Sequence, residues 1–166
     1  MEQVIVYYVV SPVHVYNAKL LSSELGGWTL RLAYEKISSW LDDDRLKDCP
    51  FETWAFGPED IPDALWRGNV GAVVFSTLQP RGGPLELLVA AMEREIPTVA
   101  VEESNQIALN RGAVNNYILP VDKALTASEH ERRGMVAAGF PAARFEATGW
   151  PFYGGRLGKL SEKSKA

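Results

Sequence analysis

A single histidine follows the first apolar run of the chain. Residues 4–10 are β-branched or aromatic, and His14 comes just after Ser11 and Pro12. A neutral imidazole near a helix start can act as a general base toward a hydroxyl group, so His14 is the candidate catalytic residue. Ser11 and Asn17 stand on either side of it and are candidate substrate-binding residues. The alternative is a histidine that only caps or packs in this loop.

A polar segment follows a later apolar run at 97–101. It contains Glu102, Glu103, Asn105 and Gln106. Carboxylates and carboxamides suit paired hydrogen bonds to sugar hydroxyl groups, so we expect these four side chains to bind substrate. The alternative is a helix start, in which the acidic residues offset the helix dipole and Ser104 is the cap.

Two more loops carry candidate substrate-binding residues. Thr77 follows the apolar run 70–75, and Ser128 and Glu129 follow the run 123–126. Ser128 and Glu131 have the spacing of a capping box, which is a sufficient structural explanation for Ser128. No Walker loop and no Gly-x-Gly-x-x-Gly segment follows a predicted strand, which counts against ATP, GTP or NAD as the ligand. We expect no cofactor.

These residues need a scaffold, and apolar strands alternate with amphipathic helices along the whole chain. The spacing predicts strands at 4–10, 28–34, 51–56, 70–75, 97–101, 123–126 and 144–148. It predicts helices at 13–25, 37–41, 61–66, 84–95, 104–110 and 129–138. In two of these helices we expect an inward-facing set of apolar residues: Val13, Tyr16, Leu20, Leu21 and Leu25 in one, and Leu85, Leu88, Val89 and Met92 in the other.

Such alternation predicts an α/β fold: a Rossmann-like three-layer α/β/α domain with a mostly parallel sheet of six to seven strands. Ligands of these folds bind outside the carboxyl ends of the strands, where the residues named above would lie. We expect one domain over residues 1–153 and a polar tail over 154–166.

Composition excludes several function classes. The net charge of −4 gives no basic field for nucleic acid. The apolar runs are far shorter than the about 20 residues of a membrane span, and the start of the chain does not have the form of a signal peptide. The lone cysteine, Cys49, fits a reducing cytoplasm, and the two histidines have no metal-ligand spacing. We therefore expect a cytoplasmic protein without a metal.

The second half of the chain resembles a known stretch of protein. The segments concerned are 122–129 (Asp-Lys-Ala-Leu-Thr-Ala-Ser-Glu), 139–141 (Gly-Phe-Pro) and 148–151 (Thr-Gly-Trp-Pro). Their order resembles the end of the N-terminal domain of GT-B glycosyltransferases, of the UDP-N-acetylglucosamine 2-epimerase group and of CDP-glycerol glycerophosphotransferases. The segment around His14 is similar to the first loop of many GT-B enzymes, although the Gly-Gly pair common there is absent.

The resemblance implies the acceptor-side half of a glycosyltransferase-like protein, of the kind used in cell-surface carbohydrate biosynthesis. In those families the C-terminal domain holds most contacts to the sugar nucleotide, and this chain ends about where that domain would begin. The expected partners are a sugar-containing small molecule or acceptor, together with a second chain that carries the nucleotide-binding half or with a second copy in a homodimer. Either would cover an apolar face near 150–153.

Two other functions stay open. One is a non-catalytic binding or regulatory module that keeps this fold. The other is a small homodimeric enzyme that processes sugar nucleotides, in which Glu102 and Glu103 would carry out acid-base chemistry. The sequence therefore leaves open whether the chain is an enzyme by itself.

Overall fold

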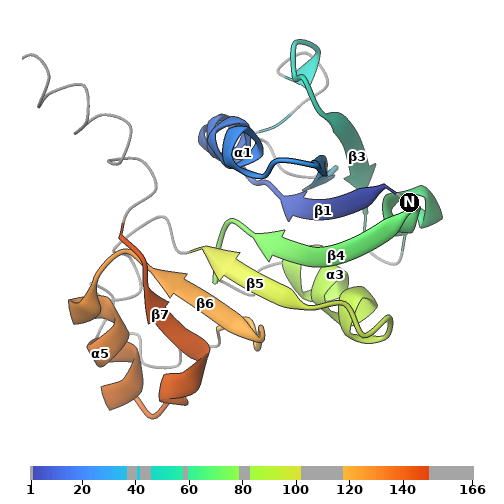
Figure 1. Ribbon diagram of the computed structural model, residues 1–166. Coiled ribbons are helices and arrows are strands. Elements are labelled where there is room, and N and C mark those ends of the chain that lie inside the picture. Colours follow the sequence, from blue (N-terminus) through green and yellow to red (C-terminus); the bar gives the residue numbers. More distant parts are fainter. Residues whose placement is uncertain are drawn as a thin grey trace, which may run out of the picture.

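A computed structural model describes residues 2–36, 41, 46–57, 60–78, 83–101 and 118–149. Its strands form one parallel sheet in the order β3-β2-β1-β4-β5-β6-β7 (Figure 1). Their bounds are β1 Gln3–Tyr8, β2 Trp28–Glu35, β3 Glu52–Phe56, β4 Asn69–Phe75, β5 Thr98–Val101, β6 Lys123–Thr126 and β7 Phe145–Ala147. The predicted α/β class with a parallel sheet is confirmed.

Helices cover both faces of this sheet. The helix α1 (Pro12–Glu24) packs on one face, and α3 (Gly83–Met92), the 3-10 turn η1 (Asp63–Trp66) and α5 (Glu129–Ala137) pack on the other. Figure 1 shows α1 and α3 on opposite sides of β1 and β4. A second short 3-10 turn, η2 (Ala142–Arg144), leads into β7. The layers are those of a Rossmann-like domain.

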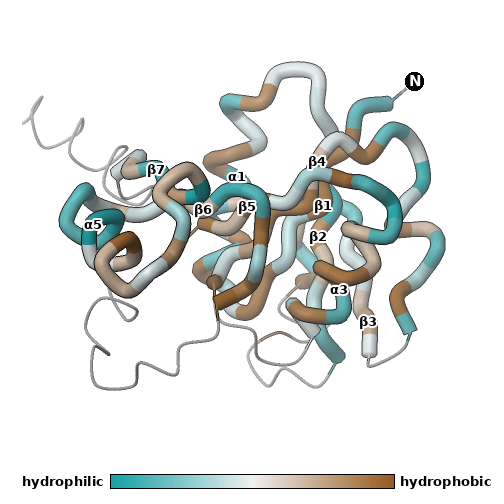
Figure 2. Tube along the Cα trace, turned by 90° about the horizontal axis from the view of Figure 1, so that it is seen from below, coloured by the Kyte–Doolittle hydropathy of each residue, from teal (hydrophilic) through white to brown (hydrophobic). Residues whose placement is uncertain are grey.

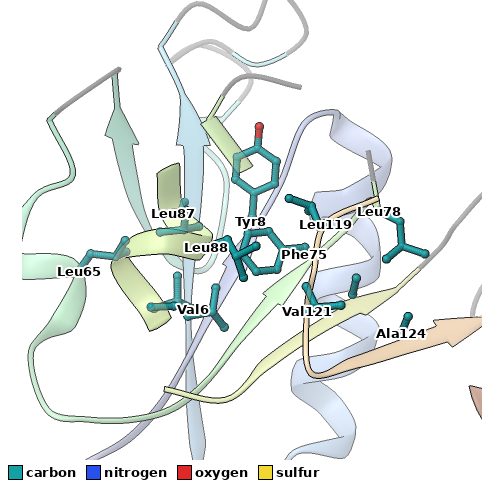
Figure 3. Packing of buried hydrophobic residues seen from close by; sticks show 14 of the residues in the cluster. Val6, Tyr8, Leu65, Phe75, Leu78, Leu87, Leu88, Leu119, Val121 and Ala124 are labelled. Carbon is teal, nitrogen blue, oxygen red and sulfur yellow. The ribbon is translucent and has the colours of Figure 1, made fainter. Parts of the chain in front are cut away.

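The strand β1 is buried on both faces, which explains its unbroken apolar sequence. Val6 and Tyr8 belong to the core beneath α3, whereas Ile5, Tyr7 and Val9 belong to the core beneath α1. The rings of Phe56 and Phe75 lie 6.0 and 6.2 Å from the Tyr8 ring, in tilted arrangements. Figure 3 shows Leu87, Leu88 and Phe75 packed around Val6 and Tyr8. This core fixes β1 and β4 side by side.

Two polar clusters stabilise the amino-terminal edge of the sheet. The buried Arg31 donates to Glu52 Oε2 at 2.8 Å and to Glu2 Oε2 at 3.3 Å, and also to the carbonyl oxygens of Leu65 and Arg67. Its guanidinium group is therefore used to join β2 and β3 to the turn η1, in keeping with the rule that buried charges are paired.

The second cluster joins β5 to β6. Asp122 Oδ2 accepts hydrogen bonds of 2.8 Å from both the backbone N–H and the hydroxyl of Thr98, and the N–H of Asp122 donates to Thr98 Oγ1 at 3.0 Å. These bonds to Thr98 hold the pKa of Asp122 below its ordinary value. The aspartate at the start of the segment 122–129 thus has a structural role.

The predicted inner face of α3 is wrong. Leu88 is buried, as expected, but Leu85, Val89 and Met92 are 45%, 47% and 57% exposed. The residues that face the sheet are Gly83, Pro84, Leu87, Leu88 and Ala91. Most residues of the helix are apolar, and most of its trace has hydrophobic colours in Figure 2, so the apolar pattern does not fix its rotation.

The predicted inner face of α1 is wrong in its first turn. Val13 and Tyr16 are half exposed, and Asn17 and Ala18 are buried in their place. The small Ala18 allows the helix to approach the sheet, and Val15, Leu21 and Leu25 pack beside it. The first turn of α1 therefore leaves apolar surface in solvent beside His14.

The other predicted elements agree with the structure to within a few residues at their ends. The predicted helix at 104–110 and the predicted apolar face at 150–153 lie outside the described residues, as does nearly all of the predicted helix at 37–41. None of the helices among the described residues is both long and apolar enough to cross a bilayer.

Candidate functional site

The strand order reverses direction between β1 and β4. The chain runs outward from β1 to β3 on one side and from β4 to β7 on the other, and β1 pairs with β4 in the middle. In open parallel sheets this switch point leaves a crevice outside the carboxyl ends of the two strands, where ligands bind. The segments that follow β1 and β4 are therefore the first place to look for a site.

His14 and Ser76 meet at this switch point. The backbone N–H of Val10 donates to His14 Nδ1 at 3.0 Å, and Ser76 Oγ lies 2.9 Å from the same nitrogen. Ser76 is buried and directly follows β4, where its own N–H donates to the carbonyl of Tyr8. The half-buried imidazole is thus held from both strands.

Three of the other predicted residues lie in the same two segments. Ser11 is the N-cap of α1 in an extended conformation, and its side chain makes no capping hydrogen bond. Thr77 follows Ser76 and is half-buried, whereas Asn17 is buried against the sheet one turn beyond the start of α1. The structure therefore brings Ser11, His14 and Thr77 to one edge of the sheet, as the sequence predicted, and turns Asn17 inward.

Two ionisable groups lie near this edge on the other side of β1. Burial raises the pKa of the Tyr8 phenol, and the charge of Glu35 at the end of β2 raises it further. Tyr8 consequently keeps its proton at neutral pH. Its hydroxyl points away from the packed rings in Figure 3. Sequence reasoning missed Tyr8 because β1 reads as uniformly apolar, and it missed Glu35 because it did not consider the end of β2.

Ser128 and Glu129 lie elsewhere along the edge and have structural partners. The strand β6, which they follow, is three strand spacings from β1, or about 14 Å. Ser128 Oγ accepts a hydrogen bond of 3.2 Å from the N–H of Glu131, and Glu131 Oε2 accepts one of 2.9 Å from the N–H of Ala127. The expected N-cap bond of Ser128 at the start of α5 is present, and the reciprocal bond of Glu131 goes to the N–H of Ala127 in place of Ser128.

Glu129 is engaged on the surface of α5. It accepts hydrogen bonds of 2.7 and 2.8 Å from Arg132 and one of 3.3 Å from Arg133. The hydrogen bonds from Arg132 lower the pKa of Glu129 to about 2, with a smaller contribution from Arg133. Glu129 is thus a charged carboxylate in an ion-pair cluster.

The remaining predicted residues, Glu102, Glu103, Asn105 and Gln106, lie outside the described residues. Among the residues that the structure describes, no group of three or more His, Cys, Asp or Glu side chains is arranged to hold a metal ion. The cluster at the switch point is therefore the candidate site that the described part of the chain supports best.

No protein-family model matches the chain, and no curated protein matches it.

Ser76 is the site residue that the sequence pointed to least clearly. It lies within the segment after β4, but a buried serine at a strand end has no sequence signature of its own. Its role becomes visible only through the pairing of Tyr8 with Phe75, which brings the ends of β1 and β4 together. The signal available in the sequence was its position, directly after a strand at the predicted ligand edge.

Proposed function

We propose that this chain is the acceptor-side half of a glycosyltransferase-like protein of the GT-B kind. A second domain or chain would supply most contacts to the sugar nucleotide. The observation that carries the proposal is the polar cluster of His14 and Ser76 at the switch point of a parallel sheet. The resemblance of residues 122–151 to the end of a GT-B N-terminal domain supplies the reaction class.

Several features around His14 support an acceptor site. Val13 and Tyr16 leave exposed apolar surface on the first turns of α1, and Ser11 and Thr77 add hydroxyl groups. Apolar surface with a few fixed polar groups is typical of a small-molecule site. A sugar hydroxyl would meet the imidazole of His14, and the apolar surface would meet the carbon side of the sugar.

A second feature supports a domain junction after β7. The N–H of Thr148 donates to the carbonyl of Thr126, which extends the pairing of β6 with β7. Gly149 then has φ of +86°, a conformation that a side chain at this position would disfavour. The backbone just after β7 therefore has a conformation that favours glycine, at the point where the resemblance implies passage to a second domain.

The test measures sugar and nucleotide binding by the full chain. Saturation-transfer NMR with N-acetylglucosamine should show contact that is lost in His14→Ala and kept in His130→Ala, a change on the exposed surface of α5. Calorimetry with UDP-N-acetylglucosamine and with CDP-glycerol should show weak binding or none. Tight nucleotide binding by this chain alone would contradict the split arrangement. Sugar binding that His14→Ala leaves unchanged would favour a module that keeps the fold without its chemistry.

The proposed setting is the cytoplasm, where sugar nucleotides are available and Cys49 would stay reduced. The proposed partner is a chain that carries the nucleotide-binding half, or a second copy of this chain. Size-exclusion chromatography with light scattering distinguishes the two, because the homodimer forms from the purified chain alone.

A further inference from the structure

The hydrogen bonds at His14 Nδ1 decide where the ring carries its proton. The N–H of Val10 points at this nitrogen over 3.0 Å. A backbone N–H can only donate, so Nδ1 has to be the lone-pair acceptor. Any hydrogen bond between Ser76 Oγ, 2.9 Å away, and the same atom then has the serine hydroxyl as its donor, and the two donors share one lone pair. The neutral ring consequently carries its own proton on Nε2.

Other arrangements of the ring lose these bonds. A ring turned by 180° would place the C–H of Cδ2 against the Val10 N–H and the Ser76 hydroxyl. A proton on Nδ1 would point at the N–H of Val10. Ser76 is 2% exposed, so little water can replace a lost partner there. The surroundings of Nδ1 therefore favour a single tautomer.

We propose that His14 works through its Nε2–H group, as a hydrogen-bond donor to a ligand oxygen, and that Val10 and Ser76 are the positioning residues for this role. The inference rests on the proposed function, because it takes the switch point as the ligand site. A proton already occupies Nε2, and two donors face Nδ1, so the ring in this position does not remove a proton from an acceptor hydroxyl. It binds the lone pair of a hydroxyl, carbonyl or phosphoryl oxygen instead.

This role differs from the general base that the sequence suggests. A general base needs an unprotonated nitrogen directed at the substrate, whereas a neutral imidazole that presents N–H stabilises charge on an oxygen. In a transfer reaction the acceptor proton would then leave to another group, from the second half of the protein or from another segment of this chain. The fixed tautomer thus assigns His14 to binding and polarisation.

The experiment is ¹⁵N NMR on the full chain, which has only two histidines, His14 and His130. His130→Asn removes the second set of ring signals and assigns the first. A long-range ¹H–¹⁵N correlation should show unprotonated Nδ1 and protonated Nε2 at His14, in a ratio of at least about ten to one. A scalar coupling across the hydrogen bond should connect Val10 N with His14 Nδ1. A proton on Nδ1, or an even mixture of tautomers, would overturn the inference.

Ser76→Ala tests the positioning role. It should weaken the coupling from Val10 and lower the tautomer ratio severalfold, whereas Ser23→Ala, which removes an exposed hydroxyl at the far end of α1, should change neither. An unchanged ratio and coupling in Ser76→Ala would exclude Ser76 as a positioning residue. Addition of N-acetylglucosamine should shift the Nε2 signal. If the Nε2–H tautomer is present but the sugar causes no shift, the proposed function fails and the assignment of the ring proton stands.

Discussion

The hydrogen bonds between Thr98 and Asp122 should stabilise the sheet measurably. Asp122→Ala removes two hydrogen bonds to its carboxylate, and Thr98→Val removes the two bonds of the hydroxyl while keeping the side-chain shape. Hydrogen bonds to charged groups contribute about 1.5–3 kcal/mol when sheltered. Asp122 is exposed, so we take about 1 kcal/mol for each bond. Each single substitution should then lower the free energy of unfolding by about 2 kcal/mol.

The double variant gives the sharper test. The two single substitutions remove one bond in common, between Thr98 Oγ1 and Asp122 Oδ2. The double variant therefore loses three bonds in all and should cost about 3 kcal/mol, which is a coupling of about 1 kcal/mol. Urea unfolding followed by circular dichroism measures all four proteins. Additive losses would show that the two side chains do not interact.

The same pair predicts a pH dependence. The pKa of Asp122 is lower in the folded chain than in the unfolded chain, because Thr98 donates to the charged carboxylate. Its contribution is fully present above the ordinary aspartate pKa of about 3.9, and it is lost as the pH falls through the lower, folded value. The difference between the native protein and Asp122→Ala should thus shrink in acid. A difference that stays constant from neutral pH to pH of about 3 would refute the reasoning.

Three further tests, made with five substitutions, concern packing and helix capping. Leu88→Ala should lower the free energy of unfolding by about 3 kcal/mol. Val89→Ala, on the exposed side of α3, should change it by less than about 0.5 kcal/mol. Equal losses in urea unfolding would contradict the rotation of α3 described above. Gly83→Ala should lower the free energy of unfolding by about 1–3 kcal/mol, because the added Cβ would lie 2.7 Å from the ring of Phe56 in β3. Gly26→Ala is the matched control in the same assay, because the space around Gly26 is open. Ser128→Ala should cost about 1 kcal/mol through loss of the N-cap of α5, and unchanged thermal unfolding would show that this bond contributes nothing.

The strands were predictable from the sequence because their burial leaves a direct pattern. The apolar run of β1 reads as a strand buried on both faces, the run of β4 reads as a clear strand, and both occur where expected. Turn residues such as Gly27, with φ of +86°, mark the end of a helix equally directly. These signals are local, so a single sequence contains them.

The rotation of α3 could not be predicted in the same way. Leu85, Leu88, Val89 and Met92 have the spacing of one helical face, but Leu87 and Ala91 offer a second face that is equally apolar. Gly83 decides between them, because its missing side chain allows the helix start to approach Phe56 closely. The contact of α3 with β3, which is distant in the sequence, therefore determines which of its two apolar faces packs on the sheet.

The site was predictable in its position but not in its chemistry. His14 and Thr77 were expected at the carboxyl edge because each closely follows a strand. The position of the ring proton of His14 depends on Val10 and Ser76. Ser76 directly follows β4, which is far from β1 in the sequence and lies beside it only because the two strands pair in the sheet. A residue type suggests what a side chain is able to do, whereas its hydrogen-bond partners determine which of those roles it performs.

The pairing of β1 with β4 also has a consequence for how the protein folds. In the sheet as described, every other pair of neighbouring strands is consecutive in the chain, but Gln3 and Asn69, which pair at the start of β1 and β4, are 66 positions apart. Closing so long a loop costs conformational entropy before any contact repays it, and such steps slow folding. We therefore expect β1–β3 and β4–β7 to form their local pairings first. His14 and Ser76 come together only when the two parts join, so we expect the site to form in the last step of folding.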